Sequence, residues 1–232
     1  MQCVILAAGK GTRMRPLTDL HPKCLVKINE RPILDYIVEA LPDEINELIL
    51  VIGYRGDQVR HHCGDTFYGK KVEYVEQSNP VAGTANALVT AREKLKPGKF
   101  LVLMGDDLYG KSGLTHAVAH DLCVIAAESD EPEKNDVVIT KSDGTLDDIK
   151  SKPENPATKI ISTAAMVLDE HIFEYETAPD PRTGEQYLPD MVKKMAQHHP
   201  INVEVLDKWY PIGYPGDIVV VERVLKEVSL VE

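Results

Sequence analysis

The chain begins with a stretch whose residue types and order could bind a phosphate group. In residues 4–28, VILAAGKGTRMRPLTDLHPKCLVKI, a short apolar run is followed by a turn at Gly9 and Gly11 and then by the cations Arg13 and Lys23. Glycine lets the backbone approach a phosphate closely and turn several N–H donors toward it. Arginine and lysine side chains can then neutralise its charge. The stretch therefore indicates an anion site, although an ordinary tight turn with a solvated loop would have the same spacing.

This turn does not match the two common phosphate-binding signatures. The spacing G-x-x-x-x-G-K-[ST] is missing, and the dinucleotide signature would require a third glycine at the position of Met14. The second expected strand ends in IGYR, which offers no acidic residue for a ribose hydroxyl. A dinucleotide-dependent oxidoreductase is therefore disfavoured.

Longer segments of this stretch resemble a known family. LAAGKGTRMRPLT followed by PKCLVKI is similar to the signature of the sugar-1-phosphate nucleotidylyltransferases, the group that contains glucose-1-phosphate thymidylyltransferase and the uridylyltransferases. The resemblance implies catalytic roles for Arg13 and Lys23 on the phosphates, and it leaves Arg15 without a role. The nucleotide-binding residues that it implies in this loop are Leu6, Ala7, Ala8, Gly9, Gly11, Thr12 and Arg13.

The resemblance continues in the middle of the chain. QSNPVAGTANAL, residues 77–88, is similar to the base-recognition segment of the family, which implies that Gln77, Gly83 and Thr84 bind the nucleotide. LMGDDLY is similar to its metal segment, which implies that Asp106 is a catalytic Mg²⁺ ligand, with Asp107 beside it as a second metal residue.

The segments that resemble the sugar-binding part depart from the usual pattern. KSKP implies that Lys152 acts catalytically on the sugar phosphate, but Ser151 stands in place of a glutamate. TGEQYLPD implies that Glu185 binds the sugar, and Asn135 stands where the family has a tyrosine that contacts it. We therefore expect Lys152, Glu185 and Asn135 to form a non-standard sugar-phosphate pocket.

The largest departure is in KWYPIGYPGDI, where Pro211 replaces the second metal-binding aspartate of the family. Proline cannot bind Mg²⁺ through its side chain. Either Asp106, Asp107 and the oxygens of the nucleotide hold the ion, or Asp217 reaches the site. Reduced activity is the third alternative.

The residues and the resemblance together predict one reaction. An oxygen of a sugar 1-phosphate attacks the α-phosphorus of a nucleoside triphosphate, which gives a nucleotide sugar and pyrophosphate. UTP or dTTP is the expected nucleotide, glucose 1-phosphate the expected acceptor and Mg²⁺ the cofactor. Two alternatives remain: an N-acetylglucosamine-1-phosphate uridylyltransferase, and a catalytically weak regulatory homologue that binds nucleotides or sugar phosphates.

The composition limits the other partners. The 232 residues carry a formal net charge of -11, which argues against broad nucleic-acid binding because such binding needs many cations. The 4 cysteines have no zinc-type or C-x-x-C spacing, so we expect reduced thiols.

No stretch has the length of a membrane span, and no signal-peptide pattern follows Met1. His116 and His120 have a spacing that could bind a transition metal on a helix, but no third ligand is near them in sequence. We expect a cytoplasmic monomer or homodimer without a membrane partner.

These residues must be positioned by alternating strands and helices. Apolar runs at 3–8, 47–54, 72–77, 99–107 and 123–129 predict strands, and helical periodicity appears at about 32–41, 83–95 and 114–120. Such alternation predicts an α/β fold: a Rossmann-like three-layer sandwich with a mixed, mostly parallel central sheet, of the nucleotide-diphospho-sugar transferase type.

The pattern changes after about residue 130. DVVIT, a turn at Asp143 and Gly144, TLDDIKSKP and ATKIISTAAMVLD predict a small antiparallel insertion, followed by helices near 188–197 and 217–228 and a strand at 202–207. We expect one domain over residues 1–232, with the nucleotide bound by about 1–130 and the sugar by about 131–232. No hexapeptide array of the β-helix type is present, so we expect no C-terminal β-helix.

Overall fold

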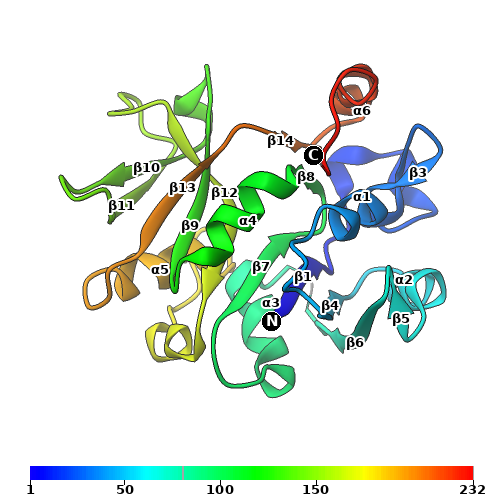
Figure 1. Cartoon of the computed structure of the whole chain (residues 1–232), viewed down its shortest axis with the longest axis horizontal. Coiled ribbons are helices and arrows are strands. Elements are labelled where there is room, and N and C mark those ends of the chain that lie inside the picture. Colours follow the sequence, from blue (N-terminus) through cyan, green and yellow to red (C-terminus); the bar gives the residue numbers. More distant parts are fainter. Residues whose placement is uncertain (80, 232) are drawn as a thin grey trace.

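The computed structural model describes residues 1–79 and 81–231. Its main sheet runs in the order β11-β10-β12-β7-β1-β4-β6-β5, and β9 and β13 continue it from the other edge of β12 (Figure 1). The strands are β1 (Gln2–Ala7), β4 (Glu47–Ile52), β5 (Thr66–Phe67), β6 (Lys70–Glu76), β7 (Phe100–Met104), β9 (Cys123–Glu128), β10 (Asp136–Thr140), β11 (Leu146–Ser151), β12 (Ile160–Leu168) and β13 (Asn202–Leu206). Two small ribbons pair β2 (Lys27–Ile28) with β3 (Arg31–Pro32) and β8 (Asp107–Tyr109) with β14 (Trp209–Pro211).

The centre of the sheet is parallel. Ile5 in β1 lies between Leu50 of β4 and Leu103 of β7, and β6 pairs with β4 in the same direction. Strands β1, β4 and β7 are apolar along almost their whole length because helices cover both faces of the sheet there, whereas β6 is mostly polar.

Successive residues of β1 point into two separate cores. Cys3 and Ile5 belong to a core with α1, α2, α4 and α6, whereas Val4 and Leu6 belong to a core with α3 and α5. The helices are α1 (Ile33–Glu39), α2 (Gly56–Cys63), α3 (Thr84–Ala91), α4 (Lys111–Ala119), α5 (Leu188–Met195) and α6 (Pro215–Val224). The predicted three-layer α/β sandwich is therefore confirmed.

The antiparallel section is built around β12. Strand β9 pairs with β12 along most of its length. The end of β12 also pairs with β7, and its start also pairs with β10, which forms a hairpin with β11. The register shifts between Ser162 and Ala165, where Ala164 has a φ of 59°. This bulge bends one long strand so that it serves both the parallel centre and the hairpin.

Several elements differ from the prediction, and some were not predicted at all. The strand expected over 99–107 ends at Met104, and Asp107 begins the separate strand β8. The helix α2 was not predicted, because GDQVRHHC is mostly polar and buries only Val59 and Cys63. The helix expected to reach 95 ends at Ala91 and continues as a 3₁₀ turn over Arg92–Lys94. None of these differences changes the predicted fold class.

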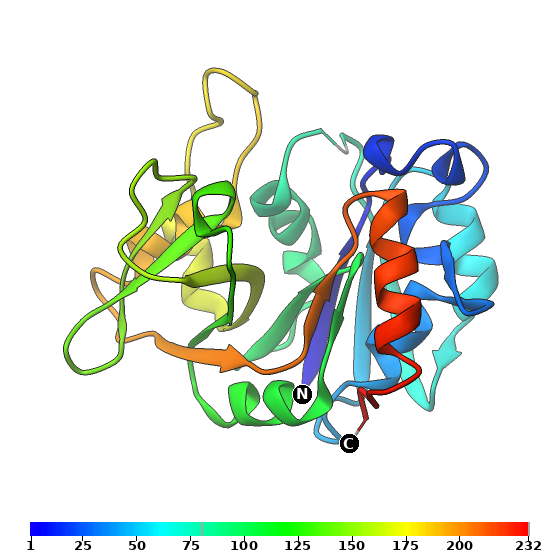
Figure 2. The same ribbon diagram turned by 90° about the horizontal axis from the view of Figure 1, so that it is seen from above.

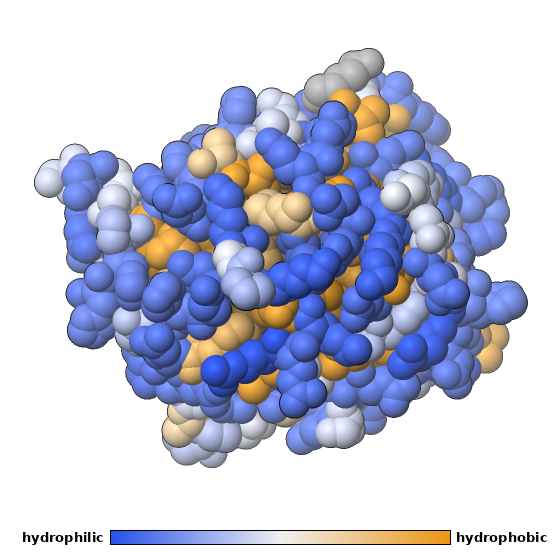
Figure 3. Space-filling model, turned by 60° about the horizontal axis from the view of Figure 1, so that its bottom comes forward, coloured by the Kyte–Doolittle hydropathy of each residue, from blue (hydrophilic) through white to orange (hydrophobic). Residues whose placement is uncertain are grey.

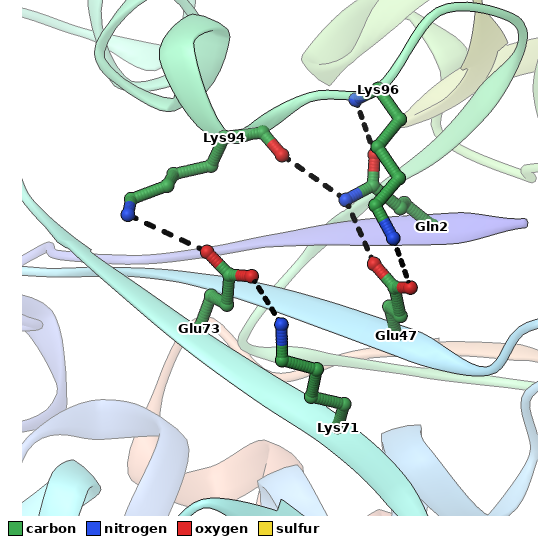
Figure 4. A network of polar contacts seen from close by, with 6 residues as sticks. All are labelled: Gln2, Glu47, Lys71, Glu73, Lys94 and Lys96. Carbon is green, nitrogen blue, oxygen red and sulfur yellow. Dashed lines mark hydrogen bonds and ion pairs between the residues drawn. The ribbon is translucent and has the colours of Figure 1, made fainter.

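The two edges of the parallel strands differ in what they carry. At the amino ends, Gln2, Glu47 and Glu73 bind lysines 71, 94 and 96 in one network of hydrogen bonds and ion pairs (Figure 4). At this edge the polar side chains bind one another. The carboxyl ends, where open α/β sheets bind ligands, carry the loops described next.

Candidate active site

A cavity of about 370 Å³ lies at the carboxyl ends of β1 and β7. All the residues expected to bind the nucleotide line it, together with Lys23, Asp106 and Glu185. Figure 2 shows the loops after β1 and β6 and the segment before α5 on the same side of the molecule, at the upper edge of the view. The fold thus brings together segments that are far apart in the sequence.

The glycine turn after β1 is folded tightly onto the chain that follows it. Gly11 has a φ of 59°, and a Cβ there would lie 3.0 Å from side-chain carbons of both Thr18 and Lys23. The Thr18 hydroxyl and the Met14 backbone N–H donate to the Gly11 carbonyl, at 2.7 and 2.9 Å. Only glycine fits this conformation in this space, and Met14 is fully buried beneath the turn. A third glycine at that position would remove core packing.

Lys23 and Asp106 form an ion pair in the wall of the cavity. The Lys23 side chain is 11% exposed and the Asp106 side chain 30%. Asp106 follows Gly105, whose N–H donates to the Leu6 carbonyl at 3.0 Å and whose Cβ, if present, would lie 3.0 Å from the same oxygen. The close approach of two strand ends at a glycine therefore places this carboxylate beside the glycine turn.

Asp107 lies outside the cavity. Its carboxylate accepts a hydrogen bond from the Trp209 indole N–H at 3.1 Å, and the residue pairs with Pro211 across the β8–β14 ribbon. Burial, together with the charge of Asp106, raises the pKa of the Asp107 carboxyl well above its usual range. The surroundings of Asp107 indicate a structural tie between β8 and β14, so its metal role stays a prediction without support from its position.

The segment with Pro211 reaches the cavity only at Gly213. One carboxylate oxygen of Asp217 accepts the backbone N–H groups of Gly213 and Tyr214, at 2.8 and 2.7 Å, and so caps the start of α6. Asp217 does not line the cavity, so the alternative in which it binds the metal has no support from its position. Asp106 and Glu185 are the acidic residues among the described cavity residues.

The other side of the cavity is formed by Gln77, Gly83 and Thr84. Gln77 is 4% exposed, and its side-chain nitrogen donates to the Gly83 carbonyl at 3.2 Å and to Asn86 Oδ1 at 3.0 Å. Gly83 has a φ of 92° directly before α3. Gln77, Gly83 and Thr84 of the expected base-recognition segment are therefore part of the cavity wall.

Glu185 enters the cavity because the chain next to it is docked on α3. The Gln186 N–H donates to the Ala82 carbonyl at 2.8 Å, and the Ala85 N–H donates to the Gln186 carbonyl at 2.9 Å. A Cβ on Gly83 would lie 2.3 Å from that same carbonyl oxygen. Gly83 is thus required for the contact between the two parts of the chain.

The two remaining sugar-phosphate residues lie together but do not line the cavity. The Lys152 N–H donates to the Asn135 carbonyl at 3.0 Å, where the β10–β11 hairpin is open. The Lys152 side chain is exposed. Their contact with a sugar phosphate stays a prediction.

The cations Arg13 and Arg15 have different surroundings. The Arg13 guanidinium lies over the Tyr214 ring, 5.3 Å from its centroid, and the residue lines the cavity. Arg15 instead pairs with Asp19 at 3.2 Å on the surface. The residue left without a role by the resemblance is therefore also the one outside the cavity.

The remaining titratable clusters do not form a second site. His116 and His120 lie 3.5 and 3.8 Å from the carboxylate of Glu204, yet within residues 1–79 and 81–231 no group of at least 3 His, Cys, Asp or Glu side chains is arranged to hold a metal ion. The cysteines are free and buried, as predicted, and burial raises the pKa of Cys24 to about 12.

Several cavity residues were not predicted. Gly105 and Gly213 stand beside recognisable motifs, and close backbone approach is the signal that could have found Gly105. The apolar residues carry no such signal, because their types are equally frequent in the core. The unpredicted cavity residues are Met14, Cys24, Ala87, Met104, Gly105 and Gly213.

Residues 2–227 match the model of a protein family described as nucleotidyl transferase. The chain belongs to the nucleotidyl transferase family. It is 29% identical over 227 residues to the bifunctional protein GlmU of Methanocaldococcus jannaschii, which covers 97% of this chain and 54% of that protein. The chain therefore spans about half the length of this curated relative. It is also 29% identical over 240 residues to the UTP–glucose-1-phosphate uridylyltransferase AglF of Haloferax volcanii, covering 98% and 97% of the two chains.

A solved structure has the same fold as this chain. A UDP-glucose pyrophosphorylase complexed with UDP-glucose superposes with a TM-score of 0.84 at 22% identity, covering 97% of this chain and 98% of that one. At this identity the likeness shows the fold. The resemblance of the sequence motifs to sugar-1-phosphate nucleotidylyltransferases is confirmed at the level of the family.

Proposed function

We propose that the chain transfers a nucleotidyl group from a nucleoside triphosphate to a sugar 1-phosphate and releases pyrophosphate. The observation that carries the proposal is a single cavity lined by the glycine turn, Gln77, the Lys23–Asp106 pair and Glu185. UTP or dTTP is the proposed nucleotide and glucose 1-phosphate the proposed acceptor. The name of the Haloferax relative, which is similar along nearly its whole length, supports this choice.

The chemistry requires positioning and charge neutralisation rather than an acid–base pair. A phosphate monoester has a second pKa of about 6, so it is already a nucleophile near neutral pH. Lys23 holds phosphate oxygens inside the cavity, and Arg13 at its rim neutralises charge on the leaving pyrophosphate. Bringing two anions together in this way supplies the orientation on which phosphoryl transfer depends.

The site fits a divalent cation that arrives with the nucleotide. Mg²⁺ is commonly bound by one or two carboxylates together with substrate phosphates and water. Asp106 lines the cavity and is partly exposed, so it would hold Mg²⁺ in exchange for its pairing with Lys23. Bound Mg²⁺ would neutralise charge on the phosphate oxygens.

We also propose which part of the chain binds which substrate. Residues up to about 130 would bind the nucleotide, and Glu185 and Gly213 would add the later part of the chain to the same cavity. Contacts of Lys152 and Asn135 with the sugar phosphate would require a substrate that extends from the cavity toward the β10–β11 hairpin.

The test is a matrix of nucleoside triphosphates against sugar 1-phosphates, read by pyrophosphate release with Mg²⁺ and with EDTA. We expect release with UTP or dTTP and glucose 1-phosphate, and none with EDTA or in Asp106→Asn. N-Acetylglucosamine 1-phosphate as the preferred acceptor would replace the proposed sugar by its alternative. No release in any combination, with tight binding of UTP by calorimetry, would favour the weak regulatory homologue that Pro211 suggests.

A further inference from the structure

We infer that Asn86 sets the base preference of this chain by fixing the orientation of the Gln77 side-chain amide. This inference rests on the proposed function, because it concerns the nucleotide bound in the same cavity. Asn86 does not line the cavity. It is a positioning residue that acts through Gln77.

The orientation of the Gln77 amide follows from its partners. A glutamine side chain presents an NH₂ group with two donors at one end and a carbonyl oxygen at the other. The Gly83 backbone carbonyl, 3.2 Å away, can only accept a hydrogen bond. The Gly83 carbonyl therefore favours the orientation in which the amide nitrogen of Gln77 faces it, and a second partner can strengthen that preference.

Asn86 occupies the second donor of that nitrogen. Its Oδ1 lies 3.0 Å from Gln77 Nε2, from the first turn of α3, where the residue is half-buried. Both N–H groups of Gln77 are thereby used by the protein. The half-burial of Asn86 holds this acceptor in place.

The free end of Gln77 is its oxygen. Within the described residues Oε1 has no hydrogen-bond partner, and it is not among the fully buried unpartnered atoms, although the residue as a whole is 4% exposed and lines the cavity. The small exposed part of Gln77 thus includes an atom that can only accept a hydrogen bond. A base that lies against this wall must donate to it.

Uracil and thymine meet this requirement, and cytosine does not. The ring nitrogen N3 carries a hydrogen in uracil and thymine, whereas in cytosine it is an acceptor. To bind cytosine N3, the Gln77 amide would have to turn over, so that its oxygen faced the Gly83 carbonyl, and the Asn86 amide would have to turn with it. Two acceptors facing each other in a buried place are costly, so this arrangement disfavours cytosine.

The experiment compares kcat/KM for UTP and for CTP in the whole chain and in three variants. Asn86→Leu keeps a branched side chain but removes the acceptor, so we expect the preference for UTP over CTP to fall about tenfold, the value of one hydrogen bond. Asn86→Asp keeps an acceptor for Gln77 and should retain the preference. Thr90→Val is the matched control on the same helix, because its hydroxyl donates only to the Asn86 backbone carbonyl at 2.7 Å.

The ratio separates positioning from general damage, since a loss of folded protein lowers both rates equally. An unchanged UTP-to-CTP ratio in Asn86→Leu overturns the inference while leaving the proposed function intact. If that variant does not melt cooperatively, Asn86→Ala repeats the comparison. A wild-type chain that neither binds nor uses UTP would overturn the proposed function, and this inference with it.

Discussion

Lys23 and Asp106 place opposite charges on one wall of a cavity that must receive a polyanion. In the structure each neutralises the other. We expect a triphosphate to replace Asp106 as the partner of Lys23, which leaves the carboxylate free for a cation that enters with the nucleotide. The pair therefore keeps the wall neutral before substrate binds, and an uncompensated charge in a partly buried wall would be unfavourable.

Arg13 and Arg15 allow a matched test of the phosphate site. They lie in the same loop, but only Arg13 lines the cavity. We expect Arg13→Ala to lower kcat by roughly 10²–10³-fold, because a donor to developing charge is lost, and Arg15→Ala to remain within about twofold. Steady-state pyrophosphate release checks both, with circular dichroism to confirm the fold. Equal rates in the two variants would remove Arg13 from the mechanism.

Single residues were predictable where type and chemistry are linked. Gln77, Glu185 and the glycine turn were placed in one site by their motifs, and all of them line the cavity. The resemblance gave Asp106 the main metal role and left Asp107 beside it as a second metal residue, because consecutive aspartates have the same chemistry; in the structure only Asp106 lines the cavity. Lys152 directly follows β11 and lies outside the cavity, so its role on the sugar phosphate stays a prediction.

Among the elements, the docking of Gln186 on α3 connects the sequence motifs to a working cavity. The contact uses main-chain atoms on both sides, so it depends on how closely the chains approach rather than on the side chain at 186. Both segments can be recognised in the sequence, but the contact between them cannot, because its hydrogen bonds involve backbone groups that every residue has.

Gly83 is the position at which this contact can be tested. We expect Gly83→Ala to lower the free energy of unfolding by about 1 kcal/mol for its positive φ and by about 1–3 kcal/mol more for the overlap with the Gln186 carbonyl. Gly98→Ala is the control, because Gly98 has a φ of 106° with open space around its Cβ. Urea denaturation measures the difference, and limited proteolysis near residue 180 should become faster in Gly83→Ala only. Equal losses in the two variants would show that the close approach is unimportant.

The strand pattern illustrates where periodicity succeeds and fails. The central parallel strands were predicted because burial on both faces makes them continuous apolar runs. The ribbon of β8 and β14 was missed because each strand has only 3 residues and its partner lies about a hundred residues away. Short strands of this kind carry no periodic signal.

The molecule as a whole is acidic, and the anion site proposed for it is local. The net charge is -11, and the face in Figure 3 is mostly hydrophilic, with apolar residues showing in patches between polar ones. Within residues 1–79 and 81–231, no helix combines the length and the apolar character that a bilayer crossing needs. Among the described residues, the cations that line the cavity are Arg13 and Lys23.

The opposite edge should affect stability without affecting catalysis. Lys96 pairs with Glu47 at the amino ends of the strands, and their side chains are 61% and 22% exposed. We expect Lys96→Met to lower the free energy of unfolding by about 1 kcal/mol or less, as exposed ion pairs contribute little, and to leave kcat and KM unchanged. Thermal melting and the transfer assay measure these two quantities. A marked loss of turnover in this variant would argue against the separation of the two edges.

The bulged strand β12 joins the two parts of the chain in one sheet. It forms ladders with β7 and β9 from the first part and with β10 from the second, and β13 closes onto β9. A fragment ending near residue 130 would leave two strands with unpaired backbone edges, which favours aggregation over independent folding. We therefore expect the proposed nucleotide-binding and sugar-binding parts to fold as one unit rather than as two modules joined at that point. In a split-gene experiment, the two fragments should be recovered together or not at all.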